Sequence, residues 1–310
     1  MENPEENFVA STEPFRRELL ALCYRMTGST EEAQDLVQET YLRAWRSYSR
    51  FEGRSSVRTW LYRIATNVCF TALDSRAIRR CPADLPPGAD AEGPWLQPVP
   101  DGLILSSRED LHERLAVRES VRLALVAALQ YLPPRQRALL ILSDVLDWSA
   151  KEAALALGTT TAAVKSALQR ARARLQTIAP TSERVSESSP PENHPLLQGY
   201  ISAFETSDPL ALEAVLRQDV RLELPPSAVW YTGREAIQCA TGALGTRGDW
   251  KLVPTVANGQ PAAGAYHREG GGYAPFAVVV LTIEGPSIVR ISVFAYTTLF
   301  PLFSLPDSPG

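Results

Sequence analysis

Residues 149–174, SAKEAALALGTTTAAVKSALQRARAR, constrain the fold most, because they predict two short helices joined by a tight turn. Ser149 and Glu152 stand in the S-x-x-E spacing of a capping box, which marks the start of the first helix. A glycine then permits the turn, and a threonine after it can cap the second helix. This part of the chain is therefore predicted to be a helix-turn-helix.

The second of these helices is predicted to carry its basic side chains on one face. Apolar residues that recur at three- and four-residue steps should face inward, and these are Val164, Leu168, Ala171 and Leu175. The outward residues are Lys165, Ser166, Gln169, Arg170, Arg172 and Arg174. Only Glu152 opposes five Lys and Arg in the whole segment, which favours a helix that meets DNA phosphates. The alternative is an ordinary helical hairpin with a solvated basic face.

Charge is segregated along the chain, although the net charge of the 310 residues is only −4. Residues 1–39 contain three arginines against nine acidic residues, whereas residues 40–82 contain nine arginines against two acidic residues. An acidic block next to a basic one indicates two surfaces for two different partners.

Neither a membrane segment nor a metal site is expected. The chain has no run of eighteen apolar residues, and its first residues are acidic and polar rather than a signal peptide, so we expect a cytoplasmic protein without a membrane partner. With no C-x-x-C pair and only three histidines, a zinc site and a disulfide framework are not expected. No cofactor is expected either. The four scattered cysteines are interpreted as buried thiols: Cys23, Cys69, Cys81 and Cys239.

The helical segment at residues 57–73 combines aromatic, basic and amide side chains. Trp60, Arg63 and Asn67 recur on one stripe of this helix. Just before it lie Phe51, Arg54 and Ser55. Aromatic side chains interleaved with arginines suit single-stranded or melted DNA, where bases stack and phosphates are neutralised. The alternative is that Trp60 and Trp45 are core aromatics, and spacing does not separate the two.

The last third of the chain has a different pattern. An amphipathic helix is predicted around Leu196–Leu216, and strands then follow at 220–224, 250–257, 276–284 and 287–296. In the last strand, alternation places Ile288, Arg290, Ser292, Phe294 and Tyr296 on one face, and Val289, Ile291, Val293 and Ala295 on the other. A helix followed by a curved antiparallel sheet predicts an α+β domain whose sheet could line a pocket.

Three motifs in this order resemble one family. AQDLVQETYLRAWR, FEGRSSVRTWLYRIATNVC and YLPPRQRALLILSDVLDWSAKEAALALGTTTAAVKSALQRARARL are similar to the two conserved domains of bacterial sigma factors, of the extracytoplasmic-function (ECF) type of the sigma-70 family. The resemblance covers roughly residues 10–178. The rest resembles a SnoaL-like domain, and the linker motif GPWLQPVPD is similar to one found in ECF members that carry this extension.

The resemblance implies a mainly α N-terminal two-thirds, with a region 2 helical bundle and a region 4 helix-turn-helix, and a C-terminal α+β cone of the SnoaL-like (NTF2-like) type. The implied boundaries are 10–81 for region 2, 82–107 for a linker, 108–178 for region 4, 179–193 for a second linker and 194–305 for the SnoaL-like domain. The function it implies is that of an RNA polymerase sigma factor, which binds core polymerase and directs promoter-specific initiation.

The resemblance also implies roles for individual residues. The polymerase-binding residues, on the β′ clamp helices, would be Asp35, Gln38 and Glu39. Those that capture the melted −10 element would be Phe51, Arg54, Ser55, Trp60, Arg63 and Asn67. Those that read the −35 element would be Lys165, Ser166, Gln169 and Arg170. Core polymerase, through its β′ clamp helices and β flap, and promoter DNA are the implied partners. The pattern departs from the family at Ala167, where many relatives carry arginine.

Two alternatives concern the linker and its motif Gly93, Pro94, Trp95 and Leu96. In the family the linker threads the active-site cleft of the polymerase, but Trp95 and Leu96 could instead anchor the C-terminal domain. From residue 194 onward that domain has seven Lys and Arg against ten acidic residues. An acidic domain tethered beside basic DNA-binding surfaces suggests that it regulates polymerase engagement, with room for a small ligand in its cone.

A catalytic C-terminal domain is the rival hypothesis, because SnoaL-like cones can use a positioned Asp or His as acid or base. The polar candidates are Asp208, Glu223, His267 and Arg290, with Trp230, Tyr231, Trp250 and Tyr266 as lining. However, Asp208 precedes a proline and should cap a helix, and His267 lies in a Gly-rich stretch that is interpreted as an exposed loop. With no convincing Asp–His pair we expect no catalytic residues and no enzyme. A stand-alone helix-turn-helix regulator is the other alternative.

Overall fold

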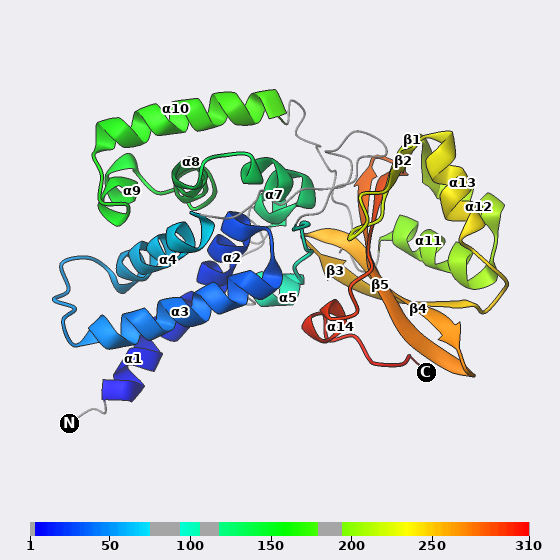
Figure 1. Cartoon of the computed structure of the whole chain (residues 1–310), viewed down its shortest axis with the longest axis horizontal. Coiled ribbons are helices and arrows are strands. Elements are labelled where there is room, and N and C mark those ends of the chain that lie inside the picture. Colours follow the sequence, from blue (N-terminus) through cyan, green and yellow to red (C-terminus); the bar gives the residue numbers. More distant parts are fainter. Residues whose placement is uncertain (1–3, 75–93, 106–117, 179–193, 310) are drawn as a thin grey trace. The chain divides into compact units, whose positions relative to one another are not determined.

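Two units make up the chain in the computed structural model, which describes residues 4–74, 94–105, 118–178 and 194–309. The first unit consists of Met1–Arg79 with Gly102–Thr181, and the second of Arg80–Asp101 with Ser182–Gly310. Both units therefore draw on parts of the chain that are separated in sequence (Figure 1).

The first half of the first unit is a helical bundle (Figure 1). Its described elements are α1 (Pro4–Thr12), the short 3-10 helix η1 (Glu13–Phe15), α2 (Arg16–Thr27), α3 (Thr30–Tyr48), α4 (Val57–Leu73) and α5 (Asp101–Ile104). Gly28 ends α2 in the left-handed conformation, with φ of 71°. Ser29 then caps α3 by accepting a hydrogen bond from the Glu32 amide at 3.3 Å. These signals let α2 and α3 pack as neighbours around Leu19, Leu22 and other buried residues.

The second half of this unit holds the helix-turn-helix. Its described elements are α7 (Leu123–Gln130), α8 (Pro134–Leu140), the π-helical turn η3 (Ile141–Val145), α9 (Ala150–Ala156) and α10 (Thr161–Ile178). The capping box of Ser149 and Glu152 is present, Gly158 adopts a positive φ of 61°, and the Thr160 hydroxyl accepts from the Ala163 amide at 3.2 Å. Val164 and Ala171 are fully buried. The predicted helix-turn-helix is confirmed.

Two buried arginines join the halves of this unit. Arg25 on α2 donates to the Ser120 hydroxyl at 2.6 Å. Arg137 on α8 donates to the Gln130 side chain at 2.7 Å and to the carbonyl of Met26. Burial lowers the pKa of both arginines to about 10. Both halves of the first unit thus meet across a polar, desolvated contact.

The second unit is a six-stranded sheet packed against helices (Figure 1). Its elements are α11 (Pro195–Thr206), α12 (Pro209–Val215), β1 (Leu216–Glu223), β2 (Trp230–Thr232), α13 (Arg234–Gly242), β3 (Trp250–Ala257), β4 (Gln260–Glu269), β5 (Gly272–Glu284), β6 (Ser287–Phe294) and α14 (Leu299–Leu302). The strand order is β2-β1-β6-β5-β4-β3. Leucine, isoleucine, valine and alanine side chains of the sheet form one core with Tyr200 and Phe204 of α11. The predicted fold class, helical first and α+β last, is confirmed.

Several details of this unit differ from the sequence predictions. The helix expected around Leu196–Leu216 is two helices, because Ser207 takes a left-handed conformation and Asp208 caps α12. The sheet is not wholly antiparallel, because β1 and β6 pair in parallel. Strand β4 was not predicted, and it places His267 opposite Trp250 in the sheet rather than in an exposed loop. Its alanine- and glycine-rich sequence lacks the β-branched residues that signal a strand.

The strict alternation predicted for the last strand is also wrong. The pairing of β5 with β6 shifts its register between Thr282 and Ile283. Such a bulge changes which residues share a face. As a result, Ile288 packs in the same core as Ile291 and Val293 instead of on the opposite face.

The linker motif belongs to the second unit. Val99 and Asn258 exchange two hydrogen bonds of 2.9 Å, and Pro100 forms an antiparallel bridge with Ala257 at the end of β3. The Gly259 amide donates to Asp101 at 2.7 Å. Of the motif, Trp95 and Leu96 are buried, whereas Gly93 lies outside the described residues, as does Cys81.

No helix among the described residues is long and apolar enough to cross a membrane. Within the same residues, no group of three or more His, Cys, Asp or Glu side chains could hold a metal ion. Cys23 and Cys69 are buried with their sulfurs 3.7 Å apart, and Cys239 is partly buried.

Candidate nucleic-acid interface

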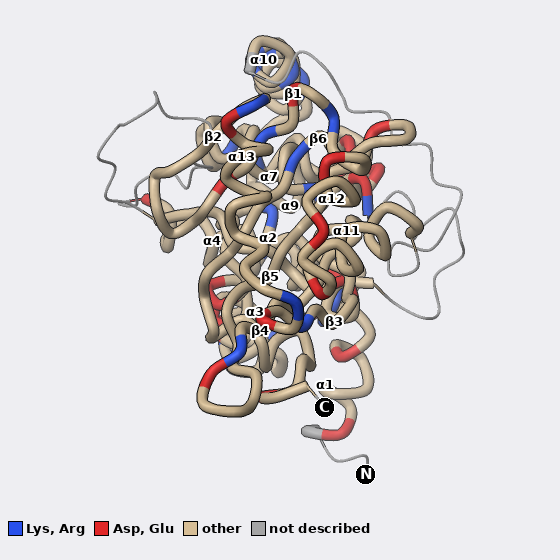
Figure 2. The backbone as a smooth tube through the Cα atoms, turned by 90° about the vertical axis from the view of Figure 1, so that its right-hand side faces the viewer, with Lys and Arg blue, Asp and Glu red and all other residues tan. Residues whose placement is uncertain are grey.

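Helix α10 presents its predicted DNA-reading residues to solvent. Lys165, Ser166, Gln169 and Arg170 are all exposed, whereas Val164 and Leu168 hold the helix against the core. Figure 2 marks the Lys and Arg positions of α10 in blue. The helix thus offers a polar and basic face of the kind that enters a major groove.

Two contacts orient the arginines of α10. The Arg170 guanidinium donates to the Ser166 hydroxyl one turn earlier at 2.5 Å. Arg172 forms a two-pronged ion pair with Asp144 of η3, with distances of 3.0 and 2.5 Å. Hydrogen bonding to Asp144 raises the pKa of Arg172. Arg170 is therefore held by a neutral hydroxyl on its own helix, whereas Arg172 is engaged with an acidic residue of the turn before the helix-turn-helix.

Helix α3 carries the predicted polymerase-binding residues. Asp35 and Gln38 are exposed on adjacent turns. Glu39 is partly exposed and pairs with Arg43 one turn later at 2.6 Å. Exposed i, i+4 pairs of this kind are weak, so Glu39 can exchange Arg43 for a cation of a partner at little cost.

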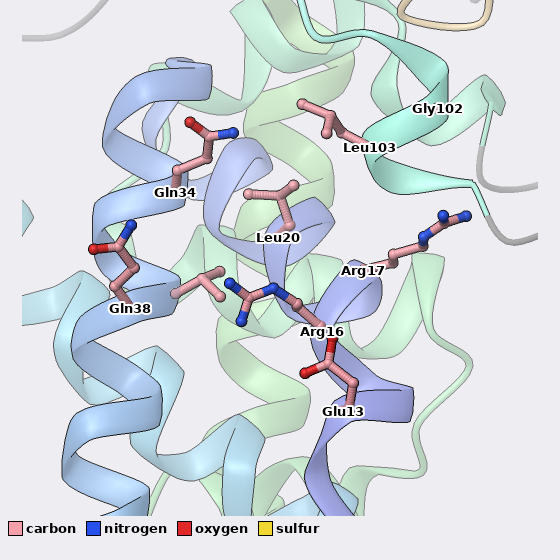
Figure 3. A pocket seen from close by; sticks show the side chains of 9 residues that line it. Glu13, Arg16, Arg17, Leu20, Gln34, Gln38, Gly102 and Leu103 are labelled. Atoms are coloured by element: carbon pink, nitrogen blue, oxygen red, sulfur yellow. The ribbon is translucent and has the colours of Figure 1, made fainter. Parts of the chain in front are cut away.

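A cavity of about 450 Å³ borders this helix (Figure 3). It is lined by the buried apolar side chains of Leu20 and Val37 and by the exposed side chains of Glu13, Arg16 and Gln38. In Figure 3, Arg16 and Glu13 lie on one side and the two glutamines of α3 on the other, with Leu103 of α5 above. The remaining lining residues are Arg17, Gln34 and Gly102. The face of α3 that bears Gln38 is thus hollowed rather than flat.

The residues predicted to capture the −10 element lie in the loop before α4 and along α4 itself. Phe51 and Trp60 pack with ring centroids 4.8 Å apart, and both are partly exposed. Ser55 is partly exposed, and Arg63 and Asn67 are exposed farther along α4. The structure therefore brings an aromatic pair next to a basic and amide stripe, as a single-strand site requires.

Arg54 lies in the loop before α4 and pairs with Glu52, whose carboxylate accepts from Arg54 Nε at 2.7 Å. Both side chains are highly exposed, at 84% and 64%, so solvent screens the pair and Arg54 can exchange it for a phosphate. Trp45 is 40% exposed and is not a core aromatic.

Sequence reasoning missed Tyr48, whose ring lies 6.2 Å from that of Trp60. It lies three residues before Phe51, and this aromatic spacing was the available signal. The contact of Trp148 with Tyr62, at 5.0 Å, was not predictable in the same way, because it joins segments far apart in sequence.

In the second unit, the polar candidates do not form one site. Asp208 caps α12 by accepting from the Ala211 amide at 3.0 Å, as expected. Glu223 is buried and lies 3.8 Å from Arg290, so these two are brought together on neighbouring strands β1 and β6. His267 packs edge-on against Trp250 at 4.8 Å.

The residues predicted to line a pocket also lie in different surroundings. Tyr231 and Trp250 pack against the apolar core of the sheet, and Trp230 is partly exposed on β2. Tyr266 instead contacts Phe300 and donates to the Pro306 carbonyl at 2.7 Å, beneath the C-terminal tail.

Comparisons with known proteins identify the family of the chain. The model of the Sigma-70 region 2 family matches residues 12–78, and that of Sigma-70, region 4 matches residues 122–175. The chain is 48% identical to "ECF RNA polymerase sigma factor SigG" of Mycobacterium tuberculosis (strain CDC 1551 / Oshkosh), over 97% of this chain and 85% of that relative. It is 27% identical to SigJ of the same species (strain ATCC 25618 / H37Rv), over 79% of this chain and 70% of SigJ.

The fold also matches a solved structure. The crystal structure of Mycobacterium tuberculosis SigJ aligns with a TM-score of 0.60 at 20% identity, covering 96% of this chain and all of that one. The predicted sigma factor is confirmed over the stand-alone regulator, because two sigma regions and a full-length relative are present. The chain belongs to the ECF RNA polymerase sigma factors of the sigma-70 family, which bind core polymerase and promoter DNA and direct promoter-specific initiation.

Proposed function

We propose that α3 docks on the β′ clamp helices of core polymerase through Asp35, Gln38 and Glu39. The exposed acidic face of α3 supports this, together with the weak Glu39–Arg43 pair that a partner cation can replace. Region 4 is proposed to contact the β flap. Because core polymerase and the chromosome are its partners, the protein acts in the cytoplasm.

The test is a pull-down of core polymerase by the full-length protein and by an Asp35→Arg/Glu39→Arg variant. Reversing two charges replaces attraction with repulsion, so binding should fall by at least about a hundredfold. Glu213→Arg on α12, an exposed acid of the other unit, is the matched control and should bind as the parent does. Unchanged binding by the double variant would place the docking surface elsewhere.

We also propose that promoter DNA is read at two places. Lys165, Ser166, Gln169 and Arg170 read the duplex −35 element, and the hydrogen bond to Ser166 orients the Arg170 guanidinium on the exposed face of α10. Phe51, Arg54, Ser55, Trp60, Arg63 and Asn67 capture the melted −10 element. The partly exposed Phe51–Trp60 pair carries this second assignment, because a flipped base needs a stacking surface.

The C-terminal unit is proposed to regulate initiation by holding the linker. Residues 82–107, between regions 2 and 4, must be free if they are to enter the polymerase cleft, whereas Val99 and Asp101 are bonded to Asn258 and Gly259. Holding the linker therefore opposes polymerase engagement. A small ligand in the cone of the C-terminal unit would act by changing how firmly this unit holds the linker. No catalytic step is proposed for it, because its polar candidates serve as a helix cap, a buried pair and a ring contact.

Asn258→Gly tests this regulation with little damage to the turn. Asn258 has a positive φ of 57°, which glycine adopts freely, and the variant loses the side-chain acceptor for Val99 while it keeps the backbone bond. Losing one buried hydrogen bond costs about 1–2 kcal/mol, so core binding should rise by up to about thirtyfold. Ser304→Gly, at another position with a positive φ of 53°, repeats the change to glycine without removing the acceptor for Val99 and is the matched control.

Removal of residues 190–310 should raise core binding further than Asn258→Gly does. If both variants transcribe and bind core polymerase as the parent does, the C-terminal unit does not regulate through the linker.

A further inference from the structure

Helix α1 precedes the part of the chain that matches Sigma-70 region 2, which begins at residue 12. Nevertheless, Phe8 of α1 is buried, with an exposed fraction of 6%. Its ring lies edge-on to those of Tyr41, Trp45 and Tyr48 on α3, with centroid distances of 6.3, 5.2 and 5.1 Å. Edge-to-face contacts of this kind stabilise a ring pair beyond the area that they bury. The N-terminal helix is therefore anchored on α3 by an aromatic side chain.

Hydrogen bonds fix the same contact. The hydroxyls of Ser11 and Tyr48 lie 3.2 Å apart, and the Tyr48 hydroxyl donates to Asn7 Oδ1 at 3.5 Å. Tyr41 separately donates to the Thr12 carbonyl at 2.9 Å. Residues of α1 thus fix the Tyr48 side chain at two points, its ring through Phe8 and its hydroxyl through Ser11 and Asn7.

Tyr48 continues this chain of rings toward the proposed single-strand site. Its ring meets Trp60 at 6.2 Å with an angle of 45° between the planes, and Trp60 meets Phe51 at 4.8 Å with 36°. Four rings therefore follow one another from Phe8 through Tyr48 and Trp60 to Phe51. Trp60 and Phe51 remain partly exposed, so each keeps surface for a base.

We propose that α1 is a positioning element of the single-strand site, in which Phe8 and Tyr48 hold Trp60 and Phe51 in the orientation that stacks an unpaired base. The proposal rests on the proposed capture of the −10 element by Phe51 and Trp60. A ring that is already ordered loses less conformational entropy when a base stacks on it, so positioning raises affinity without any new contact to DNA. Phe8, Ser11 and Tyr48 touch no base themselves.

The first test uses the full-length protein assembled with core polymerase. Its probe is a labelled single strand of mixed sequence, about 12 nucleotides long, within the range of known single-strand sites. Phe8→Ala should bind the strand about three- to tenfold more weakly, because part of the stacking on Trp60 and Phe51 is lost. A duplex of the same composition, read by region 4, should bind as before.

Matched variants separate positioning from loss of structure. Tyr41→Phe loosens α1 by removing the bond to the Thr12 carbonyl but leaves the chain of rings intact, so it should bind the single strand as the parent does. Tyr48→Leu removes a ring of the chain and should weaken binding as Phe8→Ala does. Tyr48→Phe keeps the ring and should restore most of the affinity. If Tyr41→Phe and Phe8→Ala lose the same affinity for the single strand, the proposal is wrong.

A second measurement needs no DNA. Amide hydrogen exchange of residues 51–60 should quicken in Phe8→Ala and Ser11→Ala but not in Tyr41→Phe. Unchanged exchange in Phe8→Ala would overturn the proposal. Trp60→Ala separates a failure of the proposed −10 site from a failure of the positioning role of α1. If Trp60→Ala binds single strands as the parent does, the proposed −10 site is wrong. If it loses binding while Phe8→Ala and Tyr48→Leu do not, only the positioning role is wrong.

Discussion

Arg25 and Ser120 are hydrogen-bonded at 2.6 Å although they are 95 positions apart, and the contact joins the region 2 and region 4 parts of the first unit. Arg25 is 1% exposed, and among the described residues its Nη1 atom has no hydrogen-bond partner. A buried cation with few partners carries a high desolvation cost, as its lowered pKa of about 10 indicates. The contact therefore depends strongly on the few groups that Arg25 does reach.

Removing the Ser120 hydroxyl should therefore cost more than replacing the cation. Ser120→Ala leaves a buried charged donor without its closest partner and should lower the free energy of unfolding by about 1–3 kcal/mol. Arg25→Met removes the charge but keeps the aliphatic stem, so it should cost less than about 1.5 kcal/mol. Urea denaturation of both variants gives the two losses of unfolding free energy. A larger loss in Arg25→Met than in Ser120→Ala would show that the guanidinium is a net stabiliser.

The ion pair of Asp144 with Arg172 should limit how many phosphates α10 contacts. Asp144→Asn frees Arg172 for a phosphate, so the slope of log affinity against log salt for duplex DNA should steepen by about 0.9. Arg172→Met is the matched control, in which the slope should not steepen. Fluorescence anisotropy over a series of salt concentrations gives both slopes. Identical slopes for Asp144→Asn and the parent would mean that Arg172 does not reach DNA.

The capping box should make the helix-turn-helix sensitive to acid. Hydrogen bonds from the Ser149 hydroxyl and amide lower the pKa of Glu152 below its ordinary value of 4.5. Because the folded-state pKa lies below that of the unfolded chain, the stabilisation is present above about pH 4.5 and is lost as the pH falls through the folded-state pKa. The difference in Tm between the parent and Glu152→Gln should therefore shrink as the pH falls below about 4.5. A constant difference would contradict the assignment.

Gly264 of β4 should tolerate no side chain while Leu305 is in place. A Cβ at this position would lie 2.6 Å from Leu305 Cδ1, so the buried Leu305 side chain would have to shift. Gly264→Ala should thus cost about 1–3 kcal/mol of unfolding free energy. In the background of Leu305→Ala the same substitution should cost far less, and a thermal or urea double-mutant cycle measures the coupling. If the unfolding costs of Gly264→Ala and Leu305→Ala simply add, the new Cβ does not strain the Leu305 side chain.

Short-range signals made the helix-turn-helix and its helix ends predictable. The S-x-x-E capping box, the turn glycine and the i, i+3 and i, i+4 apolar spacing each act within one or two turns of helix, so residues 149–174 contain all the information that they need. For the same reason, the exposed face of α10 and the solvent-facing Asp35 and Gln38 of α3 follow from periodicity. Their contacts with polymerase and DNA stay predictions.

Only the tertiary structure decided the relationships between distant segments. The parallel pairing of β1 with β6, the register shift that puts Ile288 beside Ile291, and the bonds of Val99 to Asn258 depend on which strands and loops become neighbours. The same holds for Arg25 beside Ser120 and for the rings from Phe8 to Phe51. Local sequence sets helix ends and faces because those interactions close within a few residues. The partners that a buried or aromatic side chain meets are set by how the whole chain packs.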